Sequence, residues 1–421
     1  MVIFGLNKKQ ITLFLLSVIL IFILFYFELI HKTYIPYFEN TVYETYSDLK
    51  YFGDTQSILI SAECHKSGIN VFIPNDCMGH YGISDSAFQY GRILLAIPNI
   101  SEINKELILI IYGSILIFIF IFVVVKLINP TSIFDNIVCI ALIFNPTTLL
   151  LIERLNFDLL IFLLLILMVI INKNYFIKVL LNLFLFSIKY YPILFVINFF
   201  IEDKLSIKKK LFFISLFFTM TIILIFFTIN DFKYIFENAA MNGRNIKYAF
   251  SVNALSRVLD HIFLANKDII KLMITIGLIV ISSINYAIFN KKILSYEEND
   301  INKKLFIICG NLLIILYIAF NNNYFREVFF IGLIPYILTL SKKNCIYSKM
   351  FLYFILFKYF FMIIFWPKVM FSNVHIESLI QYLVSIKIVI DYIVISFLIT
   401  FIINLNISVI KETFKGKRLI L

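Results

Sequence analysis

Long apolar runs alternate with short polar segments along almost the whole chain of 421 residues. A helix needs roughly 20 apolar residues to cross the hydrocarbon core of a bilayer. The pattern therefore predicts about 10 full membrane spans, at 11–30, 106–128, 133–152, 157–172, 211–229, 269–289, 305–320, 327–340, 350–366 and 379–405. The first run is too long for the apolar part of a signal peptide and no small-residue cleavage site follows it, so we expect it to be a span.

One further apolar segment, 176–201, is interrupted at its centre by Lys189, Tyr190, Tyr191 and Pro192. Each half has about 12 residues and is about 18 Å long at 1.5 Å per residue, which is too short to span alone. Proline lacks a backbone N–H and restricts the residue before it, so a helix is expected to break here. We predict a broken re-entrant helix pair that enters and leaves the membrane on the same side.

Composition agrees with this pattern, because 61% of the residues are hydrophobic, 15% are charged and the mean hydropathy is +0.93. Soluble domains are about 45–50% apolar and about 25% charged. A disordered chain, a collagen and a cytosolic enzyme with one anchor are excluded. The predicted fold is an all-α polytopic membrane protein, one integral membrane domain over 1–421 with two long loops at 32–105 and 230–265.

The net charge of +11 fits a topology in which both termini are cytoplasmic. Cytoplasmic loops carry an excess of Lys and Arg, and with this orientation more than half of those residues fall in short loops and the tail on that side. The charge therefore requires no nucleic acid. We expect a multi-pass protein of the cell membrane, in contact with membrane lipids, whose two long loops face outward.

The first outward loop offers a carboxylate on a short predicted helix. Residues 54–68 predict an amphipathic helix with Asp54 at its N-cap and Gly68 just past its end. Cys64 and Cys77 are the two cysteines expected outside, and a disulfide and two free thiols both remain open. No ligand spacing links His65, His80 and His261, so we expect no metal site.

Other polar side chains on the outward side are candidates for binding a substrate. They are Arg92, Glu153, Arg154, Asn156, Asp158, Lys189, Tyr190, Arg244, Asn253, Arg257, Tyr324 and Arg326. An ionisable residue at a helix break inside the membrane is costly, which singles out Lys189. The alternatives are a Lys189 that snorkels or forms a structural ion pair, an ion-paired helix start at 153–158, and arginines that contact lipid head groups. Lys387 and Asp391 are spaced as an i,i+4 pair, whereas Lys358 has no evident partner.

Short motifs follow one another in an order that is similar to a known family. They are Asp54 with Gly68, then 88–98, Asn145-Pro146, 153–158, 188–192, 251–257 and Asn323-Tyr324. This order resembles the GT-C class of membrane glycosyltransferases, and within it glycosyltransferase family 87, the polyprenyl-phosphate-mannose-dependent group. The resemblance covers roughly residues 40–340. Leu155 stands where that family usually has glycine.

The resemblance implies an inverting transfer of a mannose-like hexose from a polyprenyl-phosphate donor to a hydroxyl of a lipid-linked glycan or glycolipid on the extracytoplasmic face. Its general base would be an Asp of the first outward loop, which is Asp54 by motif position, with Asp48, Asp76 and Asp85 as rivals. No cofactor or metal is expected, since the donor carries no nucleotide diphosphate. Two other classes remain open, a polymerase of O-antigen or exopolysaccharide and a non-enzymatic lipid or solute transporter.

Overall fold

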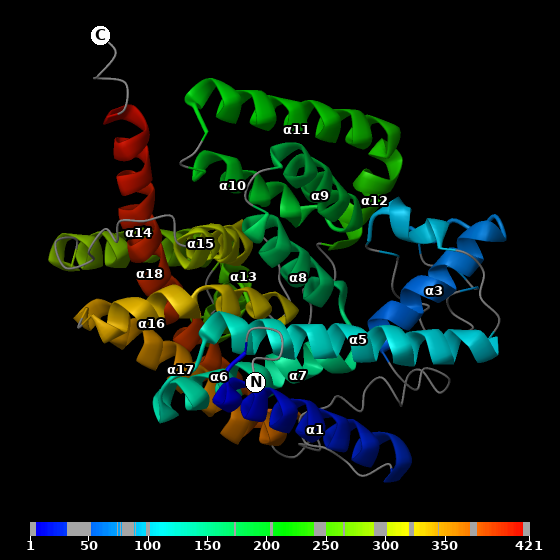
Figure 1. Cartoon of the computed structure of the whole chain (residues 1–421), viewed down its shortest axis with the longest axis horizontal. Helices are drawn as coiled ribbons and strands as arrows, with labels where there is room; N and C mark the ends of the chain where they lie inside the picture. Colours follow the sequence, from blue (N-terminus) through cyan, green and yellow to red (C-terminus); the bar gives the residue numbers. More distant parts are fainter. Residues whose placement is uncertain are drawn as a thin grey trace.

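The computed structural model describes residues 6–31, 52–73, 75, 77, 88, 90–97, 102–171, 174–202, 205–239, 250–263, 266–289, 301–319, 324–343, 345–370 and 377–415. Every element within these ranges is a helix. The arrangement is a bundle in which several of the long helices run in nearly the same direction (Figure 1). The predicted all-α class is confirmed for this part of the chain.

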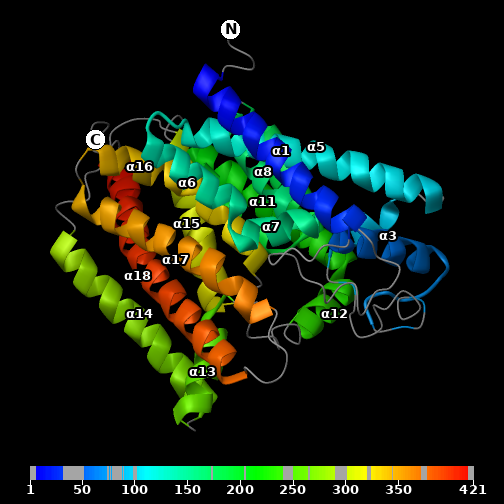
Figure 2. The ribbon, with the colours of Figure 1, turned by 90° about the horizontal axis from the view of Figure 1, so that it is seen from below.

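Six helices in the described ranges are long and apolar enough to cross a membrane. They are α5 (Glu102–Ile128), α11 (Ile207–Phe227), α14 (Lys267–Phe289), α15 (Ile301–Ala319), α17 (Ile346–Met370) and α18 (Glu377–Lys415). A seventh is possible if α6 (Ile133–Phe144) and α7 (Pro146–Glu153) form one span, bent by 46°. The protein is therefore a polytopic membrane protein. The first predicted run lies in α1 (Lys8–His31), which packs alongside α5 (Figure 2).

The predicted number of about 10 spans is not confirmed, because two of the apolar runs form shorter helices. Helix α8 (Phe157–Ile170) has 14 residues, about 21 Å, whereas the hydrocarbon core is about 30 Å thick. The run at 327–340 is divided between the 3₁₀-helix η5 (Tyr324–Gly332) and α16 (Ile334–Lys342). Apolar content alone does not distinguish a span from a short helix buried inside the bundle.

The interrupted segment folds back on itself as a hairpin. Helix α9 (Tyr175–Ile188) ends where Lys189 becomes extended, and η2 (Tyr191–Val196) and α10 (Ile197–Phe200) return. At its open end, Glu202 accepts hydrogen bonds from Lys178 at 3.1 Å and from Lys304 of α15 at 2.9 Å. The predicted break is therefore confirmed at Lys189. Lys178 and Lys304 are buried in ion pairs and are not free loop charges.

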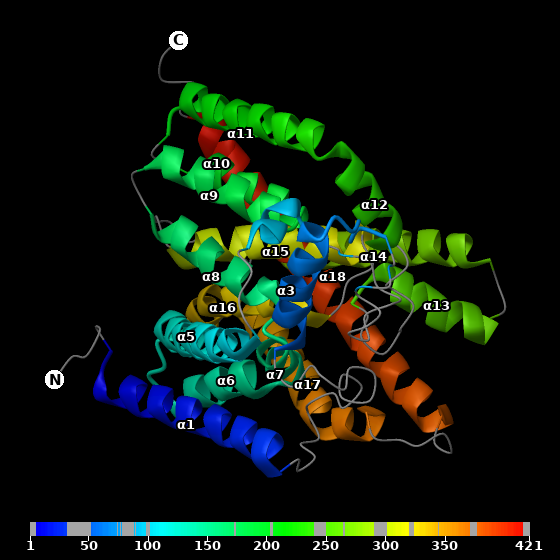
Figure 3. The ribbon, with the colours of Figure 1, turned by 90° about the vertical axis from the view of Figure 1, so that its right-hand side faces the viewer.

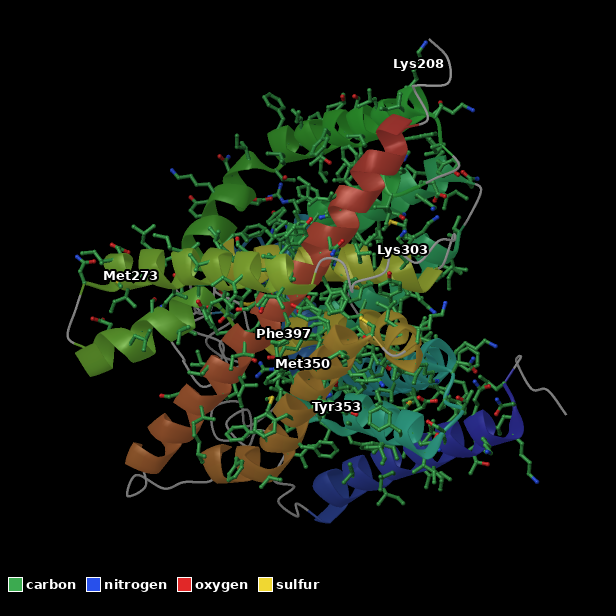
Figure 4. The ribbon with its side chains drawn as sticks, turned by 90° about the vertical axis from the view of Figure 1, so that its left-hand side faces the viewer. Lys208, Met273, Lys303, Met350, Tyr353 and Phe397 are labelled. Atoms are coloured by element: carbon green, nitrogen blue, oxygen red, sulfur yellow. A yellow bond between two sulfur atoms is a disulfide. The ribbon has the colours of Figure 1, made fainter. Side chains whose placement is uncertain are left out.

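The described parts of the two predicted outward loops are mostly helical. The first loop holds α3 (Gly53–Lys66) and η1 (Arg92–Ala96), and the second holds α12 (Ile229–Ala239) and α13 (Val252–Phe263). Helices α3 and α12 lie at the same end of the bundle, on the right in Figure 1 and toward the viewer in Figure 3. Lys208 and Lys303, labelled in Figure 4, lie near the first residues of α11 and α15.

Large apolar side chains are exposed along the outside of the bundle. Phe226 and Phe227 of α11 are 73% and 76% exposed, and Met273 of α14 is 67% exposed. Tyr353 of α17 is also exposed, at 58% (Figure 4). A soluble monomer rarely presents so much contiguous apolar surface. These faces are consistent with contact with lipid acyl chains.

Candidate functional site

The start of helix α3 is bonded to the turn between α7 and α8. The backbone N–H of Asp54 donates to the carbonyl of Arg154 at 3.1 Å, and the Thr55 hydroxyl donates to the carbonyl of Leu155 at 2.7 Å. Phe52 is the N-cap residue. The expectation that Asp54 caps the helix is therefore wrong, because Asp54 lies in the first turn and its side chain is engaged elsewhere.

The Asp54 carboxylate is held by two side chains of that turn. Arg154 approaches Asp54 Oδ1 through Nη2 at 2.8 Å and Nε at 2.9 Å. Asn156 Nδ2 donates to the other oxygen, Oδ2. Hydrogen bonds to ionised groups are roughly twice as strong as neutral ones. The carboxylate is thus fixed in orientation, and its side chain remains 12% exposed.

The turn that supplies these two partners has an unusual backbone. Leu155 has a φ of 45°, in the left-handed region that residues other than glycine rarely adopt. Its side chain is buried, which helps to offset the strain. The Asn156 side chain then caps α8 by accepting from the Asp158 N–H at 2.9 Å. Glycine would adopt this conformation without steric cost, so Leu155 is a strained position in the turn.

Lys189, at the tip of the hairpin, is paired inside the protein. Its Nζ lies 2.7 Å from Asp158 Oδ1 and 3.0 Å from Asn156 Oδ1. The Tyr191 hydroxyl donates to the same Asp158 oxygen at 2.6 Å. Lys189 therefore does not snorkel to a membrane surface. We call Asp54, Arg154, Asn156, Asp158 and Lys189 the Asp54 cluster.

Tyr90 is a residue of this site that sequence analysis did not select. The Gly91 N–H donates to the Ile188 carbonyl at 2.8 Å, and a Cβ at Gly91 would lie 1.8 Å from the Ser187 carbonyl oxygen. Only glycine allows this approach, which brings the Tyr90 ring to 5.0 Å from Lys189 Nζ. Burial, with the nearby carboxylates of the cluster, raises the Tyr90 pKa well above its usual value and keeps the phenol neutral.

Arg326, on η5, adds a positive charge beside the cluster. Its guanidinium carbon lies 4.9 Å from the centre of the Tyr191 ring. In the part of the chain that the structure describes, no carboxylate lies within ion-pair distance of Arg326. Asp54 and Asp158 are balanced by Arg154 and Lys189, so Arg326 leaves the site with one surplus positive charge.

The other sequence-selected residues either have other neighbours or are not described by the structure. Arg92 pairs with Asp231 of α12 at 3.1 Å, and the Tyr190 ring packs on Phe186. Asn253 and Arg257 lie on α13, whose main neighbours are α14, α15 and α18. Glu153 is the last residue of α7. Arg244, the side chain of Tyr324, and the rival carboxylates Asp48, Asp76 and Asp85 lie outside the described residues.

Helix α3 also carries a disulfide. Cys64, in its last turn, is bonded to Cys77, and the two Cα atoms are 6.0 Å apart. Gly68 follows the helix with a φ of 84°, in the left-handed conformation expected just past a helix end. The pairing that the sequence left open is therefore formed.

The site does not present a set of free metal ligands. Within the described residues, no group of three or more His, Cys, Asp or Glu side chains could hold a metal ion. Asp54 and Asp158 each accept hydrogen bonds from a cationic side chain.

Comparisons with protein-family models, with curated proteins and with solved structures give no match.

Proposed function

We propose that this protein is a membrane glycosyltransferase of the GT-C type. It transfers a hexose from a polyprenyl-phosphate donor to a hydroxyl of a lipid-linked glycan or glycolipid on the extracytoplasmic side of the cell membrane. The observation that carries the proposal is the position of Asp54. Its carboxylate lies on α3 and accepts hydrogen bonds from Arg154 and Asn156. Asn156 in turn accepts from Lys189 at the helix break, and the surplus cation Arg326 lies over the neighbouring Tyr191 ring.

Asp54 has the capacity to act as the general base. A carboxylate offers about four lone-pair sites, and Arg154 and Asn156 occupy three of them through Nη2, Nε and Nδ2. The remaining site on Oδ2 takes the proton of the acceptor hydroxyl, whose oxygen then bonds to the anomeric carbon. General base catalysis of this kind contributes about 10²–10⁴-fold.

The same step breaks the bond between the anomeric carbon and the phosphate oxygen, and the electron pair leaves with the polyprenyl phosphate. The phosphate gains a negative charge, which fixed cations stabilise. Arg326 supports this role because it has no carboxylate partner in the described part of the chain. A guanidinium also matches phosphate geometry with two parallel hydrogen bonds.

Two further features support the location. Disulfides persist in oxidising compartments, and the Cys64–Cys77 bond lies on the helix that carries Asp54. The lipid donor needs an apolar surface beside the site, and the outside of the bundle offers exposed apolar helices. Both features support our proposal that Asp54 lies at the outer surface of the membrane.

The test is sugar transfer by purified protein in nanodiscs, with a panel of polyprenyl-phosphate sugars and a membrane lipid extract as acceptor. Wild-type protein should consume one donor, and Asp54→Asn should lose about 10²–10⁴-fold in rate. Glu63→Gln is the matched control, because it removes a carboxylate from the same helix outside the Asp54 cluster. If the well-folded Asp54→Asn protein retains full turnover, the base is another carboxylate. If wild-type protein consumes no donor, the proposal fails and the transporter and polymerase alternatives gain.

A further inference from the structure

Four charged side chains form a closed group deep inside the bundle. Glu327 of η5 lies 2.8 Å from Lys358 of α17, which lies 2.8 Å from Asp391 of α18. Lys387 of α18 completes the ring, 2.6 Å from Asp391 and 3.5 Å from Glu327. All four are at most 3% exposed. We call these residues the buried quartet, and its formal charge is zero.

The quartet accounts for two sequence observations. Lys387 and Asp391 form the expected i,i+4 pair, but this pair belongs to a larger group. Lys358 finds its partners on two other elements, and its Nζ also lies 4.7 Å from the Phe330 ring centre and 5.0 Å from that of Phe250. Replacing a buried ionic group by apolar side chains is often neutral or stabilising. Stability alone therefore does not explain four charges in this place.

The element that Glu327 belongs to needs external support. Helix η5 is a 3₁₀-helix of nine residues, whereas runs longer than three or four residues are uncommon because the hydrogen-bond geometry is poor. A 3₁₀-helix has three residues per turn, so consecutive side chains point about 120° apart. Once Glu327 is held by Lys358, the direction of Arg326 is fixed, and it points to Tyr191 at the Asp54 cluster.

We propose that the Glu327–Lys358 ion pair of the buried quartet is a positioning device for Arg326. It ties η5, which packs on α15, α7 and α8, to Lys358 of α17 so that the surplus cation faces the Asp54 cluster. Arg326 is the group that would meet substrate, and Glu327 and Lys358 act through it. The placement of Arg326 stands on geometry alone, while the phosphate that it would contact rests on the proposed function.

Two double variants separate positioning from a general need for buried charge. Glu327→Gln with Lys358→Met removes the proposed anchor and leaves Lys387 paired with Asp391. The matched control, Lys387→Met with Asp391→Asn, also removes one cation and one anion but leaves Glu327 paired with Lys358. Both variants keep the interior neutral, so both avoid an uncompensated buried charge.

The first readout needs no enzymatic activity. Arg326→Cys places a thiol at position 326. Its labelling rate with a charged methanethiosulfonate reagent reports how accessible this position is to the reagent. The native cysteines are buried or disulfide-bonded, so the protein without Arg326→Cys gives the background rate. Combined with the anchor-removing pair, the rate should change by at least about fivefold, and with the control pair by less than about twofold. Equal changes in the two combinations would overturn the proposal.

The second readout is sugar transfer with Arg326 intact. Removing the anchor should lower kcat/KM for the donor by about five- to thirtyfold, and the control pair should keep it near the wild-type value. If wild-type protein transfers no sugar, the proposed function fails while the labelling result still decides on positioning. If transfer is present and both pairs lower it equally, the positioning role fails while the proposed function stands.

Discussion

Lys189 and Asp158 lie 2.7 Å apart although the chain separates them by 31 residues. Asp158 sits in the first turn of α8, and Lys189 follows the last turn of α9, so the pair joins the beginning of one helix to the end of the next. Asn156 bridges this pair to Asp54 by donating to the carboxylate and accepting from the ammonium group. Three segments of the chain therefore meet through one continuous network of polar side chains.

Removing Lys189 should destabilise the fold strongly. Lys189→Met leaves the carboxylate of Asp158, which is 2% exposed, with the Tyr191 hydroxyl and without its ion-pair partner. Breaking a buried pair from one side costs about 3–5 kcal/mol. The measurement is thermal unfolding in detergent. The double variant Lys189→Met with Asp158→Asn should recover a large part of the loss, and a double variant as unstable as the single one would contradict this explanation.

Gly91→Ala should displace the first loop from the hairpin. The new methyl group would lie 1.8 Å from the Ser187 carbonyl oxygen, so the backbone contact with Ile188 would be lost. Gly68→Ala is the control, because Gly68 has a positive φ but no neighbour within 4 Å, and its cost should be about 1 kcal/mol. We expect faster limited proteolysis of the first loop and lower transfer for Gly91→Ala. Equal effects of the two substitutions would show that backbone strain, not the close approach, matters.

The Arg92–Asp231 contact should give the protein a specific pH dependence. Burial raises the pKa of Asp231, while Arg92 opposes the shift. A carboxyl group whose pKa is raised on folding stabilises the protein below its unfolded pKa of about 3.9, and this contribution is lost as the pH rises through the folded pKa. Asp231→Asn removes the titrating carboxyl group, so the variant does not lose this stability as the pH rises. The melting temperature of Asp231→Asn relative to wild type should therefore increase from pH 4 toward neutrality.

Arg92→Gln provides the check on that assignment. Without the guanidinium the pKa of Asp231 should rise further, because Arg92 lowers it more than His65, the other cation that acts on it. The loss of stability with rising pH should then extend to a higher pH than in wild type. A pH profile that is identical in wild type, Asp231→Asn and Arg92→Gln would exclude Asp231 as the titrating group.

The Cys64–Cys77 disulfide should stabilise the helix that carries Asp54. The two residues are 13 positions apart, and closing a loop of about 15 residues contributes about 3 kcal/mol in the chain-entropy description. Reducing agent should lower the melting temperature of wild-type protein and leave Cys64→Ser with Cys77→Ser unchanged. Equal sensitivity of the two proteins to reductant would assign the effect to another part of the molecule.

Local sequence signals predicted the helices and the break well. The missing N–H of Pro192 and its restriction of the preceding residue predicted a break at 189–192, where α9 ends after Ile188, and Gly68 marked the end of α3. The number of spans was harder to predict from the sequence, because a 14-residue helix such as α8 is as apolar as a full span. Length and burial depend on neighbouring helices, which the one-dimensional pattern does not contain.

The site was predicted in part. Asp54, Arg154, Asn156, Asp158 and Lys189 were each selected from the sequence, and the structure brings them together. Their pairing depends on contacts between residues about 30 to 100 positions apart, which no local pattern encodes. Glu327 was not selected at all. The sequence signal that could have pointed to Glu327 was Lys358, a cation in an apolar run with no evident partner. A cation in that position requires a carboxylate on a neighbouring element.

The carboxylate of Glu202 has a consequence for how the protein opens. One of its oxygens accepts from Lys178 and the other from Lys304, so a single side chain ties both arms of the hairpin to α15. The hairpin cannot slide along α15 without exposing three buried charges at once. Its tip, and Lys189 with it, stays at a constant depth relative to the bundle. Any movement that opens the Asp54 cluster therefore falls to α3, the helix that joins the cluster from the first long loop.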